Sequence, residues 1–274
     1  MIKIEDVSFR YKNSENVLEN INLEINEGEF ISIVGKNGTG KSTILNLLAG
    51  LTKPTKGKVF IDDIDTKSKK DFINLRKKVG IVFQNPDNQI LFPRVHEDIE
   101  FALKNLDIED KEKRIEESLE VVNMLEFKNS DTYELSLGQK QRINIASMLA
   151  IKPKYLILDE PTTMIDSREK ENIYNCLRTL KRSGSTIIFV TNNVDEILLS
   201  DKVMILENKK IKYIFNKCEI LDNINLLEDS DIKIPDIIQI ILKLKQKGID
   251  INLKEWTITE MIDAIVKVYK KWKI

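Results

Sequence analysis

The glycine-rich segment GKNGTGKST (35–43) constrains the fold of this chain more than any other part of its sequence. It follows the short β-branched run FISIV (30–34) and precedes STILNLLAG (42–50), whose composition suits a helix that ends at Gly50. The segment matches the pattern G-x-x-x-x-G-K-S/T without a mismatch. A preceding strand and a following helix are the context in which this pattern forms a phosphate-binding loop.

The residue types in this loop suit the phosphates of a nucleotide. Its glycines let the backbone curl so that N–H groups point at phosphate oxygens, and the helix N-terminus adds its positive end. We expect Lys41 to reach the β- and γ-phosphates and the Ser42 hydroxyl to bind Mg²⁺. The predicted nucleotide-binding residues are Gly35, Lys36, Asn37, Gly38, Thr39, Gly40, Lys41, Ser42 and Thr43.

Two adjacent carboxylates follow a second apolar run, in YLILDEPT (155–162). Asp159 suits the coordination of Mg²⁺, and Glu160 suits a general base that polarises an attacking water. Two acids would also suit a solvated strand end, but the phosphate loop favours the catalytic interpretation. The chain is therefore predicted to bind and hydrolyse ATP.

A third motif, LSLGQKQR (135–142), opens an apolar helix with Ser136, Gly138 and Gln139. The N-terminus of that helix is a second place where an anion can be held. A serine N-cap looks similar before any helix. The motif gains weight because it lies just upstream of Asp159.

Strands and helices alternate in the second half of the chain, which predicts a mainly parallel sheet covered on both faces. The predicted elements are a strand at 155–159, a helix at about 167–182, a strand at 185–190 and a closing hairpin at 202–206 and 210–215. Apolar residues with helical spacing fill residues 94–128. We expect a nucleotide-binding domain over 1–220, a helical subdomain at about 94–150 within it, and a C-terminal helical region over 221–274.

The C-terminal region carries two apolar stripes with helical spacing, separated by a loop over 250–257. The stripes are Ile234, Ile237, Ile238, Ile241 and Leu244, and then Ile258, Met261, Ile262, Ile265 and Tyr269. Two such helices pack on each other, on the main domain or on a partner, and packing within the chain is the more common case. The final KVYKKWKI (267–274) is expected to be a solvated helix end rather than a membrane contact.

Composition excludes several classes of protein. The net charge is −1 and the pI about 6.1, so the chain has no bulk basic field for nucleic acid. Cys176 and Cys218 are predicted to be ordinary reduced thiols, and His96 as the one histidine argues against a histidine metal site. The N-terminus alternates like a strand, and no apolar run approaches the ~18 residues of a membrane helix. A cytoplasmic protein is expected.

The three motifs, in this order, resemble the ATP-binding cassette (ABC) ATPases over nearly the whole chain. The resemblance implies an α/β cassette with an N-terminal antiparallel part, a mainly parallel sheet, a helical subdomain and a small C-terminal helical extension. It assigns Tyr11 to stacking on adenine, Gln84 to linking Mg²⁺ and the water to a membrane subunit, and Asp166 to the D-loop. The implied signature, which binds the ATP of the facing subunit, is Ser136, Leu137, Gly138 and Gln139. Such cassettes act as head-to-tail pairs, so catalysis implies a second ABC ATPase.

A narrower resemblance connects FQNPDNQILFP (83–93) and the EDIEFALKNL block after it with the energy-coupling factor ATPases, including the cobalt-import type. In that group the glutamine here numbered Gln89 recurs, and the tail IKIPDIIQIILKLKQKGIDI is similar to their C-terminal region, which joins the two ATPases. The resemblance implies a second ATPase, a transmembrane coupling protein and a substrate-binding membrane protein as partners. It places the chain peripherally on the cytoplasmic face of the membrane, with vitamins or cobalt and nickel ions as substrates.

Two residues depart from the family pattern. Leu137 stands where the signature usually has glycine, and we interpret this change as minor. Asn192, in FVTNNVDE (189–196), stands where the family has a histidine that contacts the γ-phosphate. An amide can donate a hydrogen bond but cannot carry a proton, and one lost transition-state donor costs on the order of 10²-fold in rate.

Asn192 has three possible interpretations. Asn192 and Asn193 could be simple turn formers after a strand. The alignment of Asp195 and Glu196 with the family favours a degenerate catalytic site instead, in which Glu160 is retained but poorly assisted. A fully active site that uses the asparagine is the alternative to degeneracy.

Other functions fit the sequence less well than that of an importer subunit. DNA-repair ATPases of the superfamily insert long coiled coils before the signature, whereas Lys41 to Leu135 leaves room only for a small helical subdomain. ABC translation factors carry two cassettes per chain, and this chain has one. Another class of ABC transporter and a non-hydrolysing ABC subunit remain alternatives; Asn192 favours the latter and Glu160 opposes it.

Overall fold

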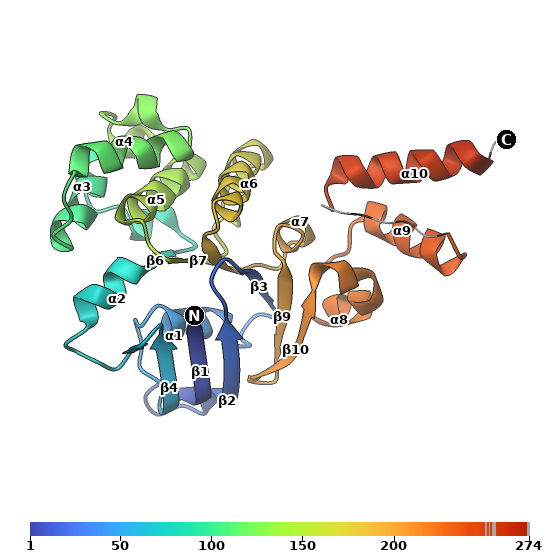
Figure 1. The fold of residues 1–274 in the computed structure, drawn as a ribbon, viewed down its shortest axis with the longest axis horizontal. Helices are drawn as coiled ribbons and strands as arrows, with labels where there is room; N and C mark the ends of the chain where they lie inside the picture. Colours follow the sequence, from blue (N-terminus) through green and yellow to red (C-terminus); the bar gives the residue numbers. More distant parts are fainter. Residues whose placement is uncertain (250, 252, 254–255, 273–274) are drawn as a thin grey trace.

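Two β-sheets and the helices packed on them form the frame of the molecule (Figure 1). The computed structural model describes residues 1–249, 251, 253 and 256–272. The first sheet is antiparallel and has the strand order β2-β1-β4-β5. Its strands are β1 (Ile2–Arg10), β2 (Asn16–Ile25), β4 (Lys56–Ile61) and β5 (Ile64–Asp65). This sheet is the N-terminal antiparallel part that the sequence predicted.

The second sheet has the strand order β10-β9-β3-β8-β7-β6, and every neighbouring pair is parallel except β9 with β10. Its strands are β3 (Phe30–Val34), β6 (Val79–Val82), β7 (Tyr155–Asp159), β8 (Thr186–Val190), β9 (Lys202–Glu207) and β10 (Lys210–Asn216). Every residue of β3 and β8 is buried. Continuous burial is expected of parallel strands that are covered on both faces.

Helices connect the strands and cover the second sheet. They are α1 (Lys41–Leu48), α2 (Phe72–Lys78), α3 (Val95–Asn105), α4 (Lys111–Val121), α5 (Leu137–Ile151), α6 (Ser167–Arg182) and α7 (Val194–Ile197). Short 3-10 helices lie at η1 (Pro86–Asn88), η2 (Leu125–Phe127), η3 (Thr132–Glu134) and η4 (Lys217–Asn223). The apolar faces of α3 and α4 pack in one core with α5. These two helices confirm the helical structure expected over residues 94–128.

The C-terminal segment contains α8 (Ile224–Asp229), α9 (Asp236–Gln246) and α10 (Ile258–Trp272). Ile238 and Ile241 of α9 are buried in one cluster with Val203 and Ile205 of β9, so this stripe packs within the chain. One expectation was wrong: Ile234 is buried but precedes α9, because Pro235 lies at the helix N-cap. 

The stripe on α10 is only partly covered. Met261 is buried and Ile265 packs half-buried against the same cluster. Ile258, Ile262 and Tyr269 have 55%, 49% and 58% of their surface exposed, and Val266, outside the predicted stripe, has 41%. The expected loop over 250–257 and the end of KVYKKWKI fall partly outside the described residues. Among the helices of the described chain, none has the length and apolar content needed to cross a membrane.

Candidate functional site

The phosphate loop connects β3 to α1 at the carboxyl end of the sheet. Gly35 permits the close approach of β9, because a Cβ atom there would lie 2.3 Å from the Leu206 carbonyl oxygen. Lys41 is 7% exposed, and its Nζ donates to the carbonyl oxygens of Gly35 at 2.6 Å and Lys36 at 3.2 Å. Burial lowers the pKa of Lys41, while the charges of Glu160 and Asp159 oppose that shift. The loop therefore presents a positioned cation beside two acids.

The two acids lie at the carboxyl end of β7, which pairs with β8 on one side and β6 on the other. Burial raises the pKa of Asp159, against a hydrogen bond from Ser42 that lowers it; the nearby Glu160 raises it further and Lys41 lowers it. The Asp159 carboxylate and the Ser42 hydroxyl are oxygen donors of the kind that Mg²⁺ prefers, so these residues fit that ion. The backbone of Glu160 has a left-handed φ of 44°, and its N–H donates to the Val190 carbonyl oxygen at 3.1 Å.

Gln84 reaches the same place from β6. Its Nε2 donates to Oε2 of Glu160 at 3.3 Å, and the Thr163 hydroxyl donates to the same oxygen at 3.2 Å. The structure therefore brings Gln84 and Glu160 together across 76 positions of sequence.

The two asparagines after β8 have different contacts. The side-chain nitrogen of Asn192, with its amide oriented toward the available acceptors, donates to the carbonyl oxygens of Thr191 and Gly35, each at 3.0 Å. Asn193 caps α7 by accepting a hydrogen bond from the Asp195 N–H at 2.9 Å. The turn-former interpretation therefore holds for Asn193, whereas Asn192 contacts the phosphate loop.

The third motif forms the N-terminus of α5. Ser136 and Gln139 make a capping box, in which the Gln139 N–H donates to the Ser136 hydroxyl at 3.2 Å and the Ser136 N–H donates to Gln139 Oε1 at 2.9 Å. Ser136 and Leu137 are exposed, and Gly138 is buried against Glu169 of α6. The helix thus opens toward solvent with its first turn ordered.

Comparison with known proteins agrees with this arrangement. The ABC transporter family model matches residues 18–163, which include the phosphate loop, the third motif and both acids. The chain belongs to the ABC transporter family. A curated relative, the energy-coupling factor transporter ATP-binding protein EcfA1 of Caldanaerobacter subterraneus subsp. tengcongensis, is 37% identical over 97% of this chain and 99% of its own length. The protein of the same name from Fusobacterium nucleatum is 42% identical over 86% of this chain and 94% of its own.

Solved structures of ABC cassettes have the same fold. The structure of cbiO1 from Clostridium perfringens, described as part of the ABC transporter complex cbiONQ, has a TM-score of 0.75 and 32% identity over 88% of this chain and 98% of that one. The cassette MJ0796, in a dimeric post-hydrolysis state bound to ADP and phosphate, has a TM-score of 0.71 and 34% identity over 79% of this chain and 98% of that one. These likenesses confirm the predicted ABC cassette fold.

Two further residues assigned by family resemblance lie at the edges of this ABC cassette's site. The Tyr11 hydroxyl is 3.1 Å from Oγ1 of Thr43, and its ring lies edge-on to Phe9 with 4.9 Å between centroids. Oδ1 of Asp166 caps α6 by accepting from the N–H groups of Arg168 and Glu169. Stacking of Tyr11 on adenine and a D-loop role for Asp166 stay predictions.

Gln89 braces the strand that leads to Gln84, a contact that no sequence pattern revealed. Its Oε1 accepts from the Phe83 N–H at 3.1 Å, and its Nε2 donates to the Ile81 carbonyl oxygen at 3.0 Å. Gln141 of α5 donates to the Phe83 carbonyl oxygen at 3.0 Å. Only the recurrence of Gln89 in the related ATPases pointed to it beforehand.

Glu196 was not predicted as a site residue. It is 2% exposed, and its carboxylate accepts hydrogen bonds from the hydroxyls of Thr162, Thr191 and Tyr174. Burial raises its pKa, and these three hydrogen bonds act in the opposite direction. The available signal was its match, with Asp195, to the residues that follow the family histidine.

Proposed function

We propose that this chain is the ATP-binding subunit of an energy-coupling factor importer that takes up a vitamin or a transition-metal ion. The names of its curated relatives support this assignment, and so does its likeness to cbiO1, which is part of a transporter complex. The chain would lie peripherally on the cytoplasmic face of the membrane. A second ATPase, a transmembrane coupling protein and a substrate-binding membrane protein would be its partners.

The residues of the site support ATP hydrolysis with a division of roles. The loop N–H groups and Lys41 would hold the phosphates, and Glu160 would orient the attacking water and accept its proton. Mg²⁺, held by Asp159, Ser42 and Gln84, would neutralise charge on the phosphates. Gln84 would also orient Glu160, because its amide already donates to that carboxylate.

The signature turn supports pairing with a second cassette. Its exposed residues at the start of α5 would complete the ATP site of the partner, since a helix N-terminus favours an anion. The exposed residues Ile258, Ile262, Val266 and Tyr269 on α10 support a second contact with the partner through the C-terminal region.

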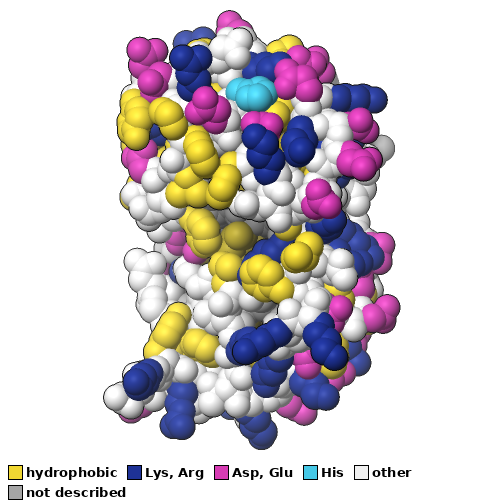
Figure 2. All heavy atoms as spheres, turned by 90° about the vertical axis from the view of Figure 1, so that its left-hand side faces the viewer, with side chains coloured by type: hydrophobic (Ala, Val, Ile, Leu, Met, Phe, Trp, Pro, Cys, Tyr) yellow, Lys and Arg dark blue, Asp and Glu magenta, His cyan; other side chains and the backbone are white. Residues whose placement is uncertain are grey.

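An exposed apolar surface on α2 and on the segment before α3 supports docking of the transmembrane coupling protein. Phe72 and Ile73 on α2 and Leu91 before α3 have 53%, 55% and 67% of their surface exposed. The face of the molecule that carries α2 and α3 has hydrophobic side chains gathered along a hollow (Figure 2). Contact there would reach Glu160 through Gln84.

The contact of Asn192 with Gly35 supports a more specific proposal, that the ATP site of this chain is catalytically degenerate. The amide is shorter than an imidazole, and its nitrogen donates to the Gly35 carbonyl oxygen, a backbone atom of the loop. The site would bind ATP but assist Glu160 poorly. The partner's phosphate loop, completed by this chain's signature, would then perform most of the hydrolysis.

Steady-state ATP hydrolysis by the purified transporter complex tests this proposal. We expect Glu160→Gln to leave most turnover in place and loss of the partner ATPase's catalytic glutamate to remove most of it. With that partner variant as background, Asn192→His should raise turnover by up to about 10²-fold, because it restores a transition-state donor. Asn193→His is the matched control and should give no gain, since Asn193 caps α7. Equal losses from the two glutamate variants would instead indicate that asparagine serves in place of histidine.

A further inference from the structure

A buried carboxylate joins the two segments that carry Glu160 and Asn192. The hydroxyl of Thr162 donates to Oε1 of Glu196, and the hydroxyl of Thr191 donates to Oε2. Both threonines are 2% exposed, as is Glu196 itself. Each carboxylate oxygen therefore binds a different segment, and together they fix the distance between the segment of Thr162 and that of Thr191.

Each threonine is adjacent to a contact of the site. Next to Thr162, the Thr163 hydroxyl donates to Glu160 at 3.2 Å. Next to Thr191, the Asn192 amide donates to Gly35 at 3.0 Å, and the Thr191 hydroxyl accepts from the Asn193 N–H at 2.9 Å. Movement of either threonine would therefore displace a residue that faces the phosphate loop.

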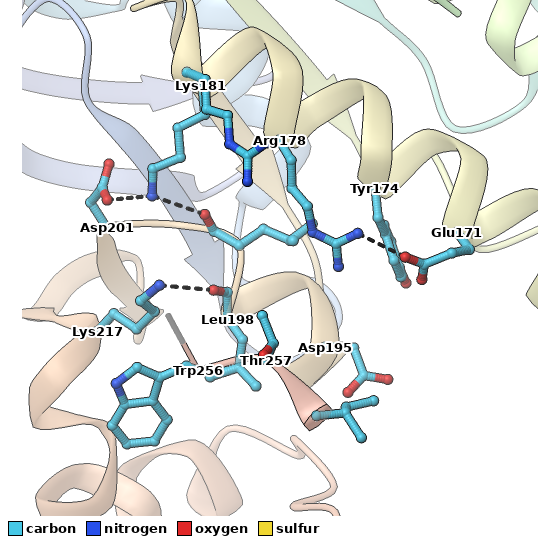
Figure 3. Close-up of a pocket in the computed structure, with 13 residues that line it drawn as sticks. Glu171, Tyr174, Arg178, Lys181, Asp195, Leu198, Asp201, Lys217, Trp256 and Thr257 are labelled. Carbon is cyan, nitrogen blue, oxygen red and sulfur yellow. Dashed lines mark hydrogen bonds and ion pairs between the residues drawn. The ribbon is translucent and has the colours of Figure 1, made fainter. Parts of the chain in front are cut away.

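A third donor comes from outside these segments. The hydroxyl of Tyr174, on α6, donates to Oε1 of Glu196 at 3.0 Å. Tyr174 lines a cavity of about 530 Å³ that Trp256 of the C-terminal segment also lines (Figure 3). The hydrogen bond from Tyr174 ties the Glu196 carboxylate to α6, a helix of 16 residues, and so restricts the movement of that carboxylate.

The energetics favour a positioning role over simple packing. Burying a carboxyl group is unfavourable unless hydrogen bonds compensate for the lost hydration, and an apolar side chain would fill this corner without that cost. What an apolar side chain cannot do is fix two hydroxyls by directional bonds. A misplacement of about 1 Å near reacting groups costs on the order of 10²-fold in rate.

We infer that Glu196 is a positioning residue. It fixes the positions of the segment after Glu160 and of the strand end before Asn192 relative to the phosphate loop. The inference rests on the proposed ATPase function, since its effect on rate has meaning only for that reaction. Glu196 acts through the two threonines: its Oε1 accepts from Thr162 in the segment after Glu160, and its Oε2 accepts from Thr191 before Asn192.

Hydrogen–deuterium exchange and ATP turnover, both measured on the purified complex, test the inference. Glu196→Gln keeps the shape but leaves one acceptor oxygen, so we expect faster exchange at residues 160–163 and 191–193. In the Asn192→His chain with the inactive partner, Glu196→Gln should lower kcat roughly 10- to 100-fold with KM for ATP changed less than about 3-fold. Thr162→Val and Thr191→Val should each speed exchange mainly in their own segment.

Asp62→Asn is the matched control, because the Asp62 carboxylate also accepts several hydrogen bonds, including one from Tyr155 at the start of β7, the end opposite Asp159. It should lower the melting temperature without faster exchange at 160–163 or 191–193. Unchanged exchange and kcat in Glu196→Gln would overturn the inference, and so would faster exchange throughout the chain with a parallel loss of ATP binding. A wild-type complex that does not hydrolyse ATP would contradict the proposed function instead, and the exchange result would still decide the role of Glu196.

Discussion

Gly138 illustrates at the scale of one residue why the signature has its composition. A Cβ atom at this position would lie 2.6 Å from both Cβ and Cγ of Glu169, so α5 and α6 approach closely only with glycine there. Glu169 in turn pairs with Arg142 at 3.0 Å, and Arg142 donates to the carbonyl oxygens of Val122 and Asn123. The first turn of α5 is therefore fixed by close packing as well as by its capping box.

Gly138→Ala should destabilise the chain by about 1–3 kcal/mol, because the added methyl group forces α6 away from α5. Chemical denaturation measures this change. Leu137→Ala is the control: its side chain is 39% exposed, so its removal should change stability by less than about 0.5 kcal/mol. Equal stability of the two variants would show that α6 relaxes without strain.

At the scale of one element, a side chain supplies hydrogen bonds to the backbone at the end of the edge strand β6. β6 has only four residues and lies at the edge of its sheet, so its free side lacks a neighbouring strand. The Gln89 amide supplies one acceptor and one donor to the backbone of Phe83 and Ile81, as a strand would. Gln84 follows directly, so the brace fixes the base of the side chain that contacts Glu160.

Gln89→Ala should lower the free energy of unfolding by roughly 1–2 kcal/mol, from the loss of two hydrogen bonds. It should also speed exchange of the Phe83 N–H and lower ATP turnover several-fold, because Gln84 is held less firmly. Asn88→Ala, at an exposed neighbouring position, provides the comparison and should leave both measurements unchanged. Normal exchange at Phe83 in Gln89→Ala would contradict the bracing role.

At the scale of the whole molecule, Asp62 links the two sheets. It follows β4 of the antiparallel sheet and accepts hydrogen bonds from Lys78 at 2.6 Å, Tyr155 at 2.6 Å and Lys154 at 2.9 Å. Tyr155 begins β7 of the second sheet, and Lys78 ends α2. Burial alone would raise the pKa of Asp62, but these donors lower it far below its usual range.

This link predicts a pH dependence of stability. Because the folded pKa of Asp62 lies below the unfolded value of about 3.9, its contribution is present above that pH and is lost as the pH falls. Asp62→Asn should therefore cost about 1–3 kcal/mol at neutral pH, and the difference from wild type should shrink below about pH 4. Denaturant titrations between pH 3 and 8 measure it, with the exposed Asp63→Asn as control. A difference that stays constant with pH would exclude the ionised carboxylate as its source.

The sequence by itself determined the local parts of this protein. The phosphate loop, the acids at the end of β7 and the start of α5 each depend on backbone geometry and capping within a few residues, so their patterns predict them directly. The family resemblance, carried by the same motifs, supplied the cassette fold and the candidates Tyr11, Gln84 and Asp166.

Only the tertiary structure decided which distant residues meet. It separated Asn192 from Asn193, gave Glu196 its three hydroxyl donors, and set Ile234 outside α9 while burying it. Those contacts depend on the order of strands in the sheet and on which loops lie side by side at its edge. A pattern of neighbouring residues does not encode that order, because strand pairing is fixed by packing between segments far apart in the chain.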